Sequence, residues 1–294
     1  MAREFISILT QMLAVGNILP WLASASSTEG SSRVLQATVV DDLLPSQTYF
    51  VPFPEDELFN SFDSISPGDV SGEVETTVVL SIGVDGTVLY YSHWEESYRN
   101  TIIWGDGDSS NGCSPRAVVC TNETDVFMAG DTIFLDNLVD PTSRGNGGIV
   151  YDGADMIRST YPIAMTRAAF PEEPGSLLAG AVEVLDIDQA AGMQFLFPLG
   201  EDSNLGTDGF ELVQAYVMAV QEGNTTLSFN GVVQDSFLTL GESIMIDNIK
   251  EGDVIVSNQA VQVYLLTGDV GSRFEMRWYS LLPFEAWGNE YINP

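Results

Sequence analysis

Short runs of β-branched, aromatic and other apolar residues recur along the chain, separated by Asp-Gly, Glu-Gly, Asn-Gly and Gly-Asp dipeptides. Runs of this kind, bounded by turn residues, are typical of β-strands. No segment keeps a helical periodicity for three turns. The pattern therefore predicts an all-β fold built of antiparallel β-sandwiches. The runs are Thr76 to Ile82, Thr87 to Tyr91, Thr132 to Leu135, Ile163 to Thr166, Ala215 to Val220 and Val261 to Leu266.

The segment VVLSIGV-DG-TVLYY, residues 78–91, predicts a β-hairpin. Asp85 and Gly86 separate two β-prone runs, and Asp-Gly supplies the positive φ that a tight hairpin turn requires.

The chain also contains similar strings in the same order, which predict two copies of one β module. Gly130 to Leu138 (GDTIFLDNL) matches Gly241 to Ile249 (GESIMIDNI) in character at every position, at an offset of 111 (241 minus 130). We therefore expect an internal duplication, with a first β-sandwich module at 46–193 and a second at 194–294. Further matched pairs are Asp85-Gly86 with Glu222-Gly223, Ser159 to Met165 with Ser257 to Val263, Gly175-Ser176 with Gly271-Ser272, and Phe195 to Pro198 with Tyr291 to Pro294.

The offsets indicate where the two copies differ. The first copy has 26 more residues between Gly86 and Gly130, because the offset falls from 137 to 111. Insertions within a repeated scaffold map to loops, where binding usually occurs. We expect an inserted loop at 92–120.

The amino terminus has the pattern of a secretory signal peptide. One Arg precedes an apolar run that ends at Ala23-Ser24-Ala25, which predicts cleavage after residue 25. An uncleaved membrane anchor is the alternative, but Gln11, Asn17 and Pro20 interrupt a run already short for a span. Residues 26–45 would then form a flexible leader, and no other segment is apolar enough to span a membrane.

Two features agree with export. Cys113 and Cys120 are the only cysteines and should form a disulfide in an oxidising compartment. The sequons at Asn122 and Asn224 predict glycosylation in a eukaryotic host. The string Phe50 to Asp56 is similar to Leu196 to Asp202 and, in part, to Tyr291 to Pro294. One interpretation is that the chain is the first part of a longer protein with further modules; the other is that its last strand closes the second module.

The charge composition excludes several kinds of partner. The chain has 42 Asp and Glu, 10 Lys and Arg and a net charge of -32. Nucleic acid is excluded as a partner, because phosphate binding depends on Lys and Arg. No phosphate-binding loop precedes Lys250, and one His with two Cys cannot build a zinc site of four Cys and His ligands. Oxygen ligands remain available, which leaves calcium as the cofactor to consider.

Four strings of the chain are distinctive: Val88 to Tyr98, Ile103 to Gly112, Pro162 to Ala169, and Val263 to Asp269 with Arg277-Trp278. They resemble a repeated β module of large secreted surface proteins, the amino-terminal domain family named after the IgG-Fc-binding protein, and the resemblance spans residues 46–294. The chain has His93-Trp-Glu-Glu-Ser-Tyr98 where that family tends to have His-Trp-Glu-Asp-Gly-Tyr. The resemblance implies an extracellular, adhesive role and supplies no catalytic residues.

Two constellations could bind ligands. His93, Trp94, Tyr98 and Trp104 form a candidate patch in which aromatic faces beside carboxylates would suit sugar rings; the alternative is that these rings belong to the core. Oxygen ligands alternate in a Gly-containing loop, as calcium accepts from a flexible chain; the alternative is a polar turn without metal. The candidate calcium ligands are Asp106, Asp108, Ser110 and Asn111, with Glu201, Asp202 and Asp208 as a second, looser set.

These observations favour a secreted or cell-surface adhesion or structural module without catalytic activity. Its partner would be an extracellular protein or glycan. One alternative is a carbohydrate-active hydrolase on a β-sandwich, although neighbouring acids such as Glu95 and Glu96 would point to opposite faces of a strand. The other alternative is a calcium-dependent structural module.

Overall fold

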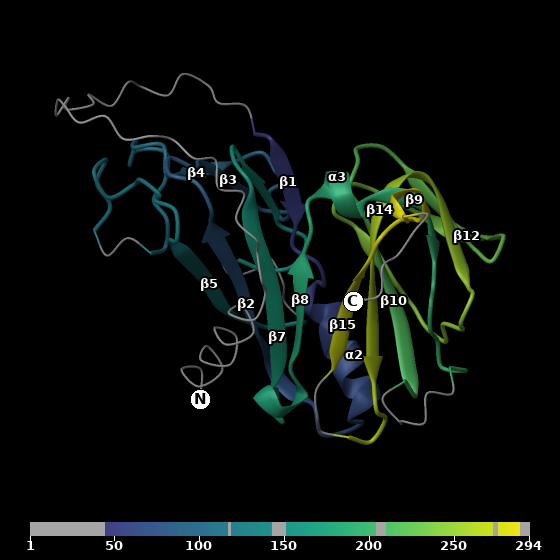
Figure 1. Ribbon diagram of the computed structural model, residues 1–294. Coiled ribbons are helices and arrows are strands. Elements are labelled where there is room, and N and C mark those ends of the chain that lie inside the picture. Colours follow the sequence, from purple (N-terminus) through teal and green to yellow (C-terminus); the bar gives the residue numbers. More distant parts are fainter. Residues whose placement is uncertain (1–44, 117–118, 143–150, 204–209, 273–275, 289–294) are drawn as a thin grey trace, which may run out of the picture. The chain divides into compact units, whose positions relative to one another are not determined.

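The computed structural model describes residues 45–116, 119–142, 151–203, 210–272 and 276–288 (Figure 1). The predicted signal peptide lies outside these ranges, as does all of the predicted leader except residue 45. The described part of the chain is mostly strand, and all of its sheets are antiparallel, which confirms the all-β prediction.

The first half of the described chain contributes two four-stranded sheets, and their side chains share one core. The first sheet has the order β1 (Gln47–Phe50), β6 (Met156–Ser159), β3 (Leu89–Ser92) and β4 (Ile102–Trp104). The second sheet has the order β5 (Thr132–Val139), β2 (Ser71–Ile82), β7 (Ile163–Glu173) and β8 (Gly180–Val184).

The second half forms one seven-stranded sheet. Its main path is β12 (Val232–Leu238), β11 (Thr225–Phe229), β14 (Val254–Gly268), β10 (Leu212–Ala219) and β13 (Ser243–Ile246), and β9 (Gly192–Leu196) and β15 (Arg277–Leu281) also pair with β14. The fifteen-residue β14 pairs with β9 and β11 along its first part and with β10 and β15 along its second. A second core of apolar side chains lies within this half, including Phe195, Val217, Ile255 and Leu265.

Because β14 changes partners along its length, the second half has the strand order of the first. The orders β9-β14-β11-β12 and β13-β10-β14-β15 correspond strand for strand to β1-β6-β3-β4 and β5-β2-β7-β8. Equivalent backbone hydrogen bonds close corresponding turns. This correspondence is what an internal duplication would leave, and the duplication itself stays a prediction, as does the boundary between 193 and 194. The matched bonds are Gly130 N to Ile82 O with Gly241 N to Ala219 O (both 2.8 Å), and Val51 N to Asp155 O (2.8 Å) with Phe197 N to Asp253 O (2.9 Å).

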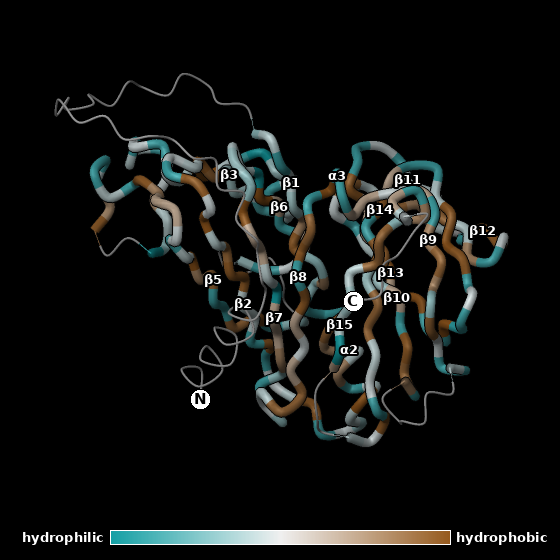
Figure 2. The backbone as a smooth tube through the Cα atoms, in the orientation of Figure 1, coloured by the Kyte–Doolittle hydropathy of each residue, from teal (hydrophilic) through white to brown (hydrophobic). Residues whose placement is uncertain are grey.

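Alternation along β10 connects the two cores. Val213, Ala215 and Val217 face the second core, whereas Tyr216 and Met218 face the first. Hydrophobic residues therefore concentrate along the strands, and many connecting loops are hydrophilic (Figure 2).

A helix that the sequence pattern did not predict packs beside the strands of both halves. α2 (Glu55–Ile65) begins with acidic residues, which favour the positive end of a helix dipole. Leu58, Phe62 and Ile65 are buried. With only four apolar residues in eleven, the helical stripe is weak, so the expectation of no helix of three turns was wrong. Short helices also occur at α3 (Ile187–Ala190), Ser176–Leu178 and Phe284–Ala286.

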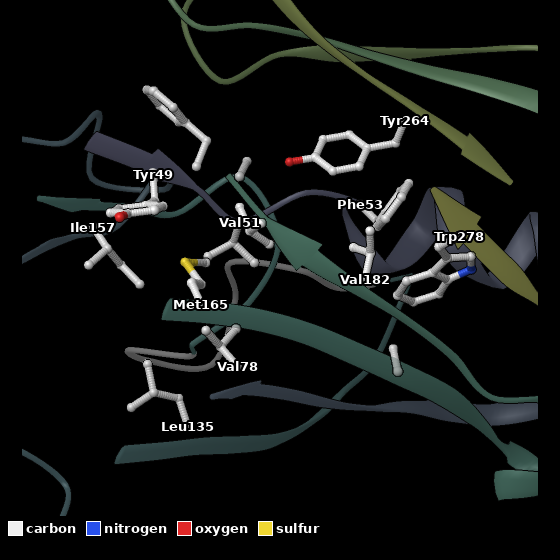
Figure 3. Packing of buried hydrophobic residues seen from close by; sticks show 14 of the residues in the cluster. Tyr49, Val51, Phe53, Val78, Leu135, Ile157, Met165, Val182, Tyr264 and Trp278 are labelled. Carbon is white, nitrogen blue, oxygen red and sulfur yellow. The ribbon is translucent and has the colours of Figure 1, made fainter. Parts of the chain in front are cut away.

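Phe53, just before α2, joins the two halves. Its ring lies 5.2 Å from that of Tyr264 and 4.7 Å from that of Trp278, measured between centroids (Figure 3). Two residues after Phe53, Glu55 forms a fully buried ion pair with Arg167 of β7.

The predicted hairpin at 78–91 does not form. β2 pairs with β5 and β7, whereas β3 pairs with β4 and β6, so the two strands belong to different sheets. Gly86 does have the expected positive φ, at 74°. Local turn chemistry was correct, but tertiary packing carries the chain across the sandwich instead of back along it.

Candidate functional site

Several polar groups at the start of the predicted inserted loop bond to one buried residue, Asp155. It directly precedes β6, and because Met156 of β6 pairs with Ser92 of β3, it lies beside His93. The carboxylate is fully buried and accepts three hydrogen bonds. The donors are the Tyr91 hydroxyl (2.8 Å), the Trp94 backbone N–H (2.9 Å) and His93 Nδ1 (3.0 Å).

His93 is only 2% exposed. Burial alone would lower the pKa of its imidazole, but the hydrogen bond to Asp155 and the charges of Asp155, Glu95 and Asp152 outweigh burial and raise this pKa. The second ring nitrogen, Nε2, is buried and has no hydrogen-bond partner among the described residues. A buried polar atom left in this state costs about 1–3 kcal/mol.

The predicted aromatic patch divides between core and surface. Trp104 is fully buried, and its ring centroid lies 5.2 Å from that of Tyr91 and 6.0 Å from that of Tyr151. Trp104 and His93 therefore belong to the interior. Trp94 and Tyr98 are only partly buried, so of the four predicted residues these two can meet a ligand.

Trp94 and Tyr98 line a pocket of about 500 Å³ between the 94–98 turn and two turns of the second half. Ser97 and Tyr98 hold the turn at φ values of 53° and 58°, and the Tyr98 hydroxyl donates to Ala154 O at 2.8 Å. Gly241 lies against both rings, because a Cβ at this position would overlap the Tyr98 hydroxyl. The turn therefore packs closely on the second half beside the pocket.

The pocket wall is acidic and hydroxyl-rich. Three glutamates, Glu95, Glu222 and Glu242, come from three different turns. The predicted glycosylation site Asn224 also lies on the wall. The other lining residues are Ser97, Gly223, Thr239 and Leu240. Such a wall offers hydrogen-bond acceptors beside two aromatic faces and disfavours anionic ligands.

The predicted calcium loop is ordered by its own hydrogen bonds. Asp108 accepts from the Ser110 N–H (3.0 Å) and hydroxyl (2.6 Å), and these bonds lower the pKa of Asp108. Asp106 accepts from the Asp108 N–H at 2.9 Å and from Asn111 Nδ2 at 2.7 Å. These bonds are those of a polar turn.

The sequence pattern did not single out one acidic residue that lies beside this loop. Asp125 is 1% exposed, and its Oδ1 accepts from the Gly105 N–H at 2.8 Å. Burial raises the pKa of Asp125, and the Asp106 carboxylate, within hydrogen-bonding reach, also raises it. Asp125 Oδ2 and Asn111 Oδ1 are buried oxygens without a hydrogen-bond partner in the described structure. Asp106 and Asp125 come together because Asp106 and Val126 form an isolated β-bridge, and no local sequence motif predicts this bridge.

The other predicted residues have structural contacts or lie elsewhere. Glu201 contacts Lys250 Nζ at 3.4 Å, and Asp202 accepts from the Glu251 N–H at 2.8 Å. Asp208 lies outside the described residues. The Cys113–Cys120 disulfide is confirmed. The sequon residue Asn122 is exposed, and its Oδ1 accepts from Ser109.

Comparison with known proteins places the chain in no family: no family model, curated protein or solved structure matches it. Within the described residues, no helix has the length and apolar character needed to cross a membrane.

Proposed function

We propose that this chain is a secreted, non-catalytic binding module of a cell surface or extracellular matrix, and that the pocket at Trp94 and Tyr98 binds a sugar ring of a glycan. The observation that carries the proposal is the pocket itself, in which two aromatic rings stand beside three glutamates and several neutral polar groups.

The physical match is with a neutral or amino sugar. A sugar ring offers a C–H face to an aromatic ring and hydroxyl donors to carboxylates. The net charge of -32 and the three glutamates disfavour sulfated or acidic glycans. A second pocket of about 560 Å³, at Gln189, Gln221 and Gln259, has no aromatic residue and therefore lacks the stacking surface.

Other features support an extracellular setting. The disulfide favours an oxidising compartment, and the predicted signal peptide and sequons agree with it. The resemblance to the IgG-Fc-binding protein domain family also favours adhesion, and further modules of a longer chain would add binding sites in series.

The test is binding to an immobilised glycan panel. Wild-type protein should bind neutral or amino sugars, and Trp94→Ala should lose at least tenfold in affinity, because an aromatic stacking partner is removed. Gln189→Ala, in the second pocket, should bind as wild type does. Equal binding by all three proteins, or selective binding of anionic glycans, would refute the proposal.

The same panel distinguishes a hydrolase, the alternative that three glutamates in one pocket favour. If the wild-type protein releases reducing sugar from the glycans, and Glu95→Gln or Glu242→Gln abolishes this release, the function is hydrolysis and the binding-module proposal is wrong. Unaltered glycans after prolonged incubation support the binding module.

A calcium-dependent structural role is a second candidate, favoured by Asp125. Two carboxylates side by side need a proton or a cation between them, and two buried oxygens there lack partners. Calcium binding only to the native state would stabilise it by about 2.7 kcal/mol at 100 times Kd. Thermal melting should show a higher midpoint with Ca²⁺ than with chelator, and Asp125→Asn should remove this difference. Asp140→Asn, in an exposed turn of similar hydrogen bonding, should keep it. An identical midpoint with and without Ca²⁺ would exclude the candidate.

A further inference from the structure

We propose that His93, Glu95 and Asp155 form a binding site for a divalent transition-metal ion, with Zn²⁺ as the best fit, at the edge of the pocket. The proposal is independent of the glycan proposal, since it concerns a different ligand and a different measurement.

Geometry brings the three side chains together from two neighbouring strands. One ligand atom from each residue lies within 4.8 Å of the other two. His93 follows β3, Glu95 lies in the next turn, and Asp155 precedes β6, which pairs with β3. His93 Nδ1 and Asp155 Oδ2 are 3.0 Å apart, close to the separation of two adjacent ligands that each lie about 2.1 Å from one ion.

The two ring nitrogens of His93 have different roles in this site. Nδ1 faces Asp155 and is the nitrogen that would bind the ion. Nε2 is buried and meets no hydrogen-bond partner in the described ranges, so it would keep the ring's proton when Nδ1 binds the ion. Metal binding would displace the proton shared by His93 and Asp155, because ligands bind ions in their deprotonated form.

The ligand set indicates which ion fits. One imidazole and two carboxylates give three protein ligands, the number found in zinc sites that keep a position for water or another ligand. Calcium takes oxygen ligands and would have no use for the nitrogen. Since Glu95 also lines the pocket, the open position would lie close to the bound ligand.

The second half provides an internal comparison. Asp253 has the place of Asp155 in the matched backbone hydrogen bonds, but it accepts from Asn230 Nδ2 (2.8 Å) and the Lys250 N–H (2.7 Å). Asp253 therefore shows that an aspartate at this place can close a turn by itself. The histidine and the glutamate that accompany Asp155, His93 and Glu95, belong to the first half.

The test uses the chain's one histidine, whose ring nitrogens give a unique pair of NMR signals in protein made without a polyhistidine tag. Titration of Zn²⁺ into the wild-type protein should shift these signals saturably at one equivalent, whereas Ca²⁺ should leave them unchanged. Glu95→Gln should weaken Zn²⁺ binding at least tenfold, and the neighbouring Glu96→Gln should change it less than twofold. Both variants keep the buried His93–Asp155 pair and should fold. No histidine shift at 1 mM Zn²⁺, equal affinity in the two variants, or an equal response to Ca²⁺ would overturn the proposal.

Discussion

The contact of the 94–98 turn with Gly241 can be tested against a matched glycine in the first half. Gly241 and Gly130 occupy equivalent turns, at φ values of 79° and 92°, and their N–H groups donate equivalent 2.8 Å hydrogen bonds. Their surroundings differ. A Cβ at 130 meets nothing within 4 Å, whereas one at 241 would overlap the Tyr98 hydroxyl and lie 2.6 Å from Trp94 Cδ1.

Alanine at either position costs about 1–2 kcal/mol, because L-residues are strained at positive φ. At 241 the new methyl must also displace Tyr98, which breaks its hydrogen bond to Ala154 (2.8 Å), worth about 0.5–1.5 kcal/mol, and uncovers part of two aromatic rings. Gly241→Ala should therefore lower the free energy of unfolding by about 1–3 kcal/mol more than Gly130→Ala does.

Urea unfolding of both variants, followed by circular dichroism and tryptophan fluorescence, measures this difference. Equal losses, within about 0.5 kcal/mol, would show that the turn does not rest on Gly241 and would remove the pocket's structural basis.

Three further predictions concern stability. Arg167→Met and Glu55→Gln should each lower the free energy of unfolding by about 3–5 kcal/mol, because each leaves a buried charge alone, and the double variant that combines them should lose less than either; additive losses in urea unfolding would contradict the pairing. Burial and the nearby Asp188 raise the pKa of Asp186 above its unfolded value, so the acid form favours the native state and stability is lost as pH rises through the folded pKa. Asp186→Asn keeps an acceptor for the Asp188 N–H that caps the helix and loses the one for the Thr48 N–H, and its stability relative to wild type should rise as pH rises through the folded pKa of Asp186; Asp186→Ala should lose about 1 kcal/mol because the helix cap is removed, and an Asn variant whose difference from wild type is constant with pH would refute this. Replacing Cys113 and Cys120 by Ser should lower the free energy of unfolding by about 2.5 kcal/mol, because the bond restricts the unfolded chain, and a loss below about 0.5 kcal/mol would contradict this entropic account.

The sequence predicted local features well and long-range neighbours poorly. Val261 to Leu266 reads as a strand because β-branched and apolar residues dominate it, and it lies in β14. Turn glycines such as Gly86 have the expected conformation. The partner of each strand depends on the whole sandwich, so the hairpin after Gly86 was mispredicted.

The candidate site shows the same limit. Trp94 and Tyr98 could be singled out by residue type and by their place in the predicted insertion. Asp155 could not, because it comes 62 residues after His93 and reaches it only through the pairing of β3 with β6. Trp104 looked like Trp94 in sequence, and only the sheet geometry buries one ring and leaves the other at a pocket.

The most direct test of glycan binding at this pocket is an NMR titration that follows the tryptophan indole N–H signals. With a neutral or amino sugar that the protein binds, the Trp94 signal should shift in proportion to saturation. The signals of buried Trp104 and of Trp287, which lies outside the pocket, should stay in place. Binding that leaves the Trp94 signal unmoved, or that moves Trp287 instead, would contradict the account.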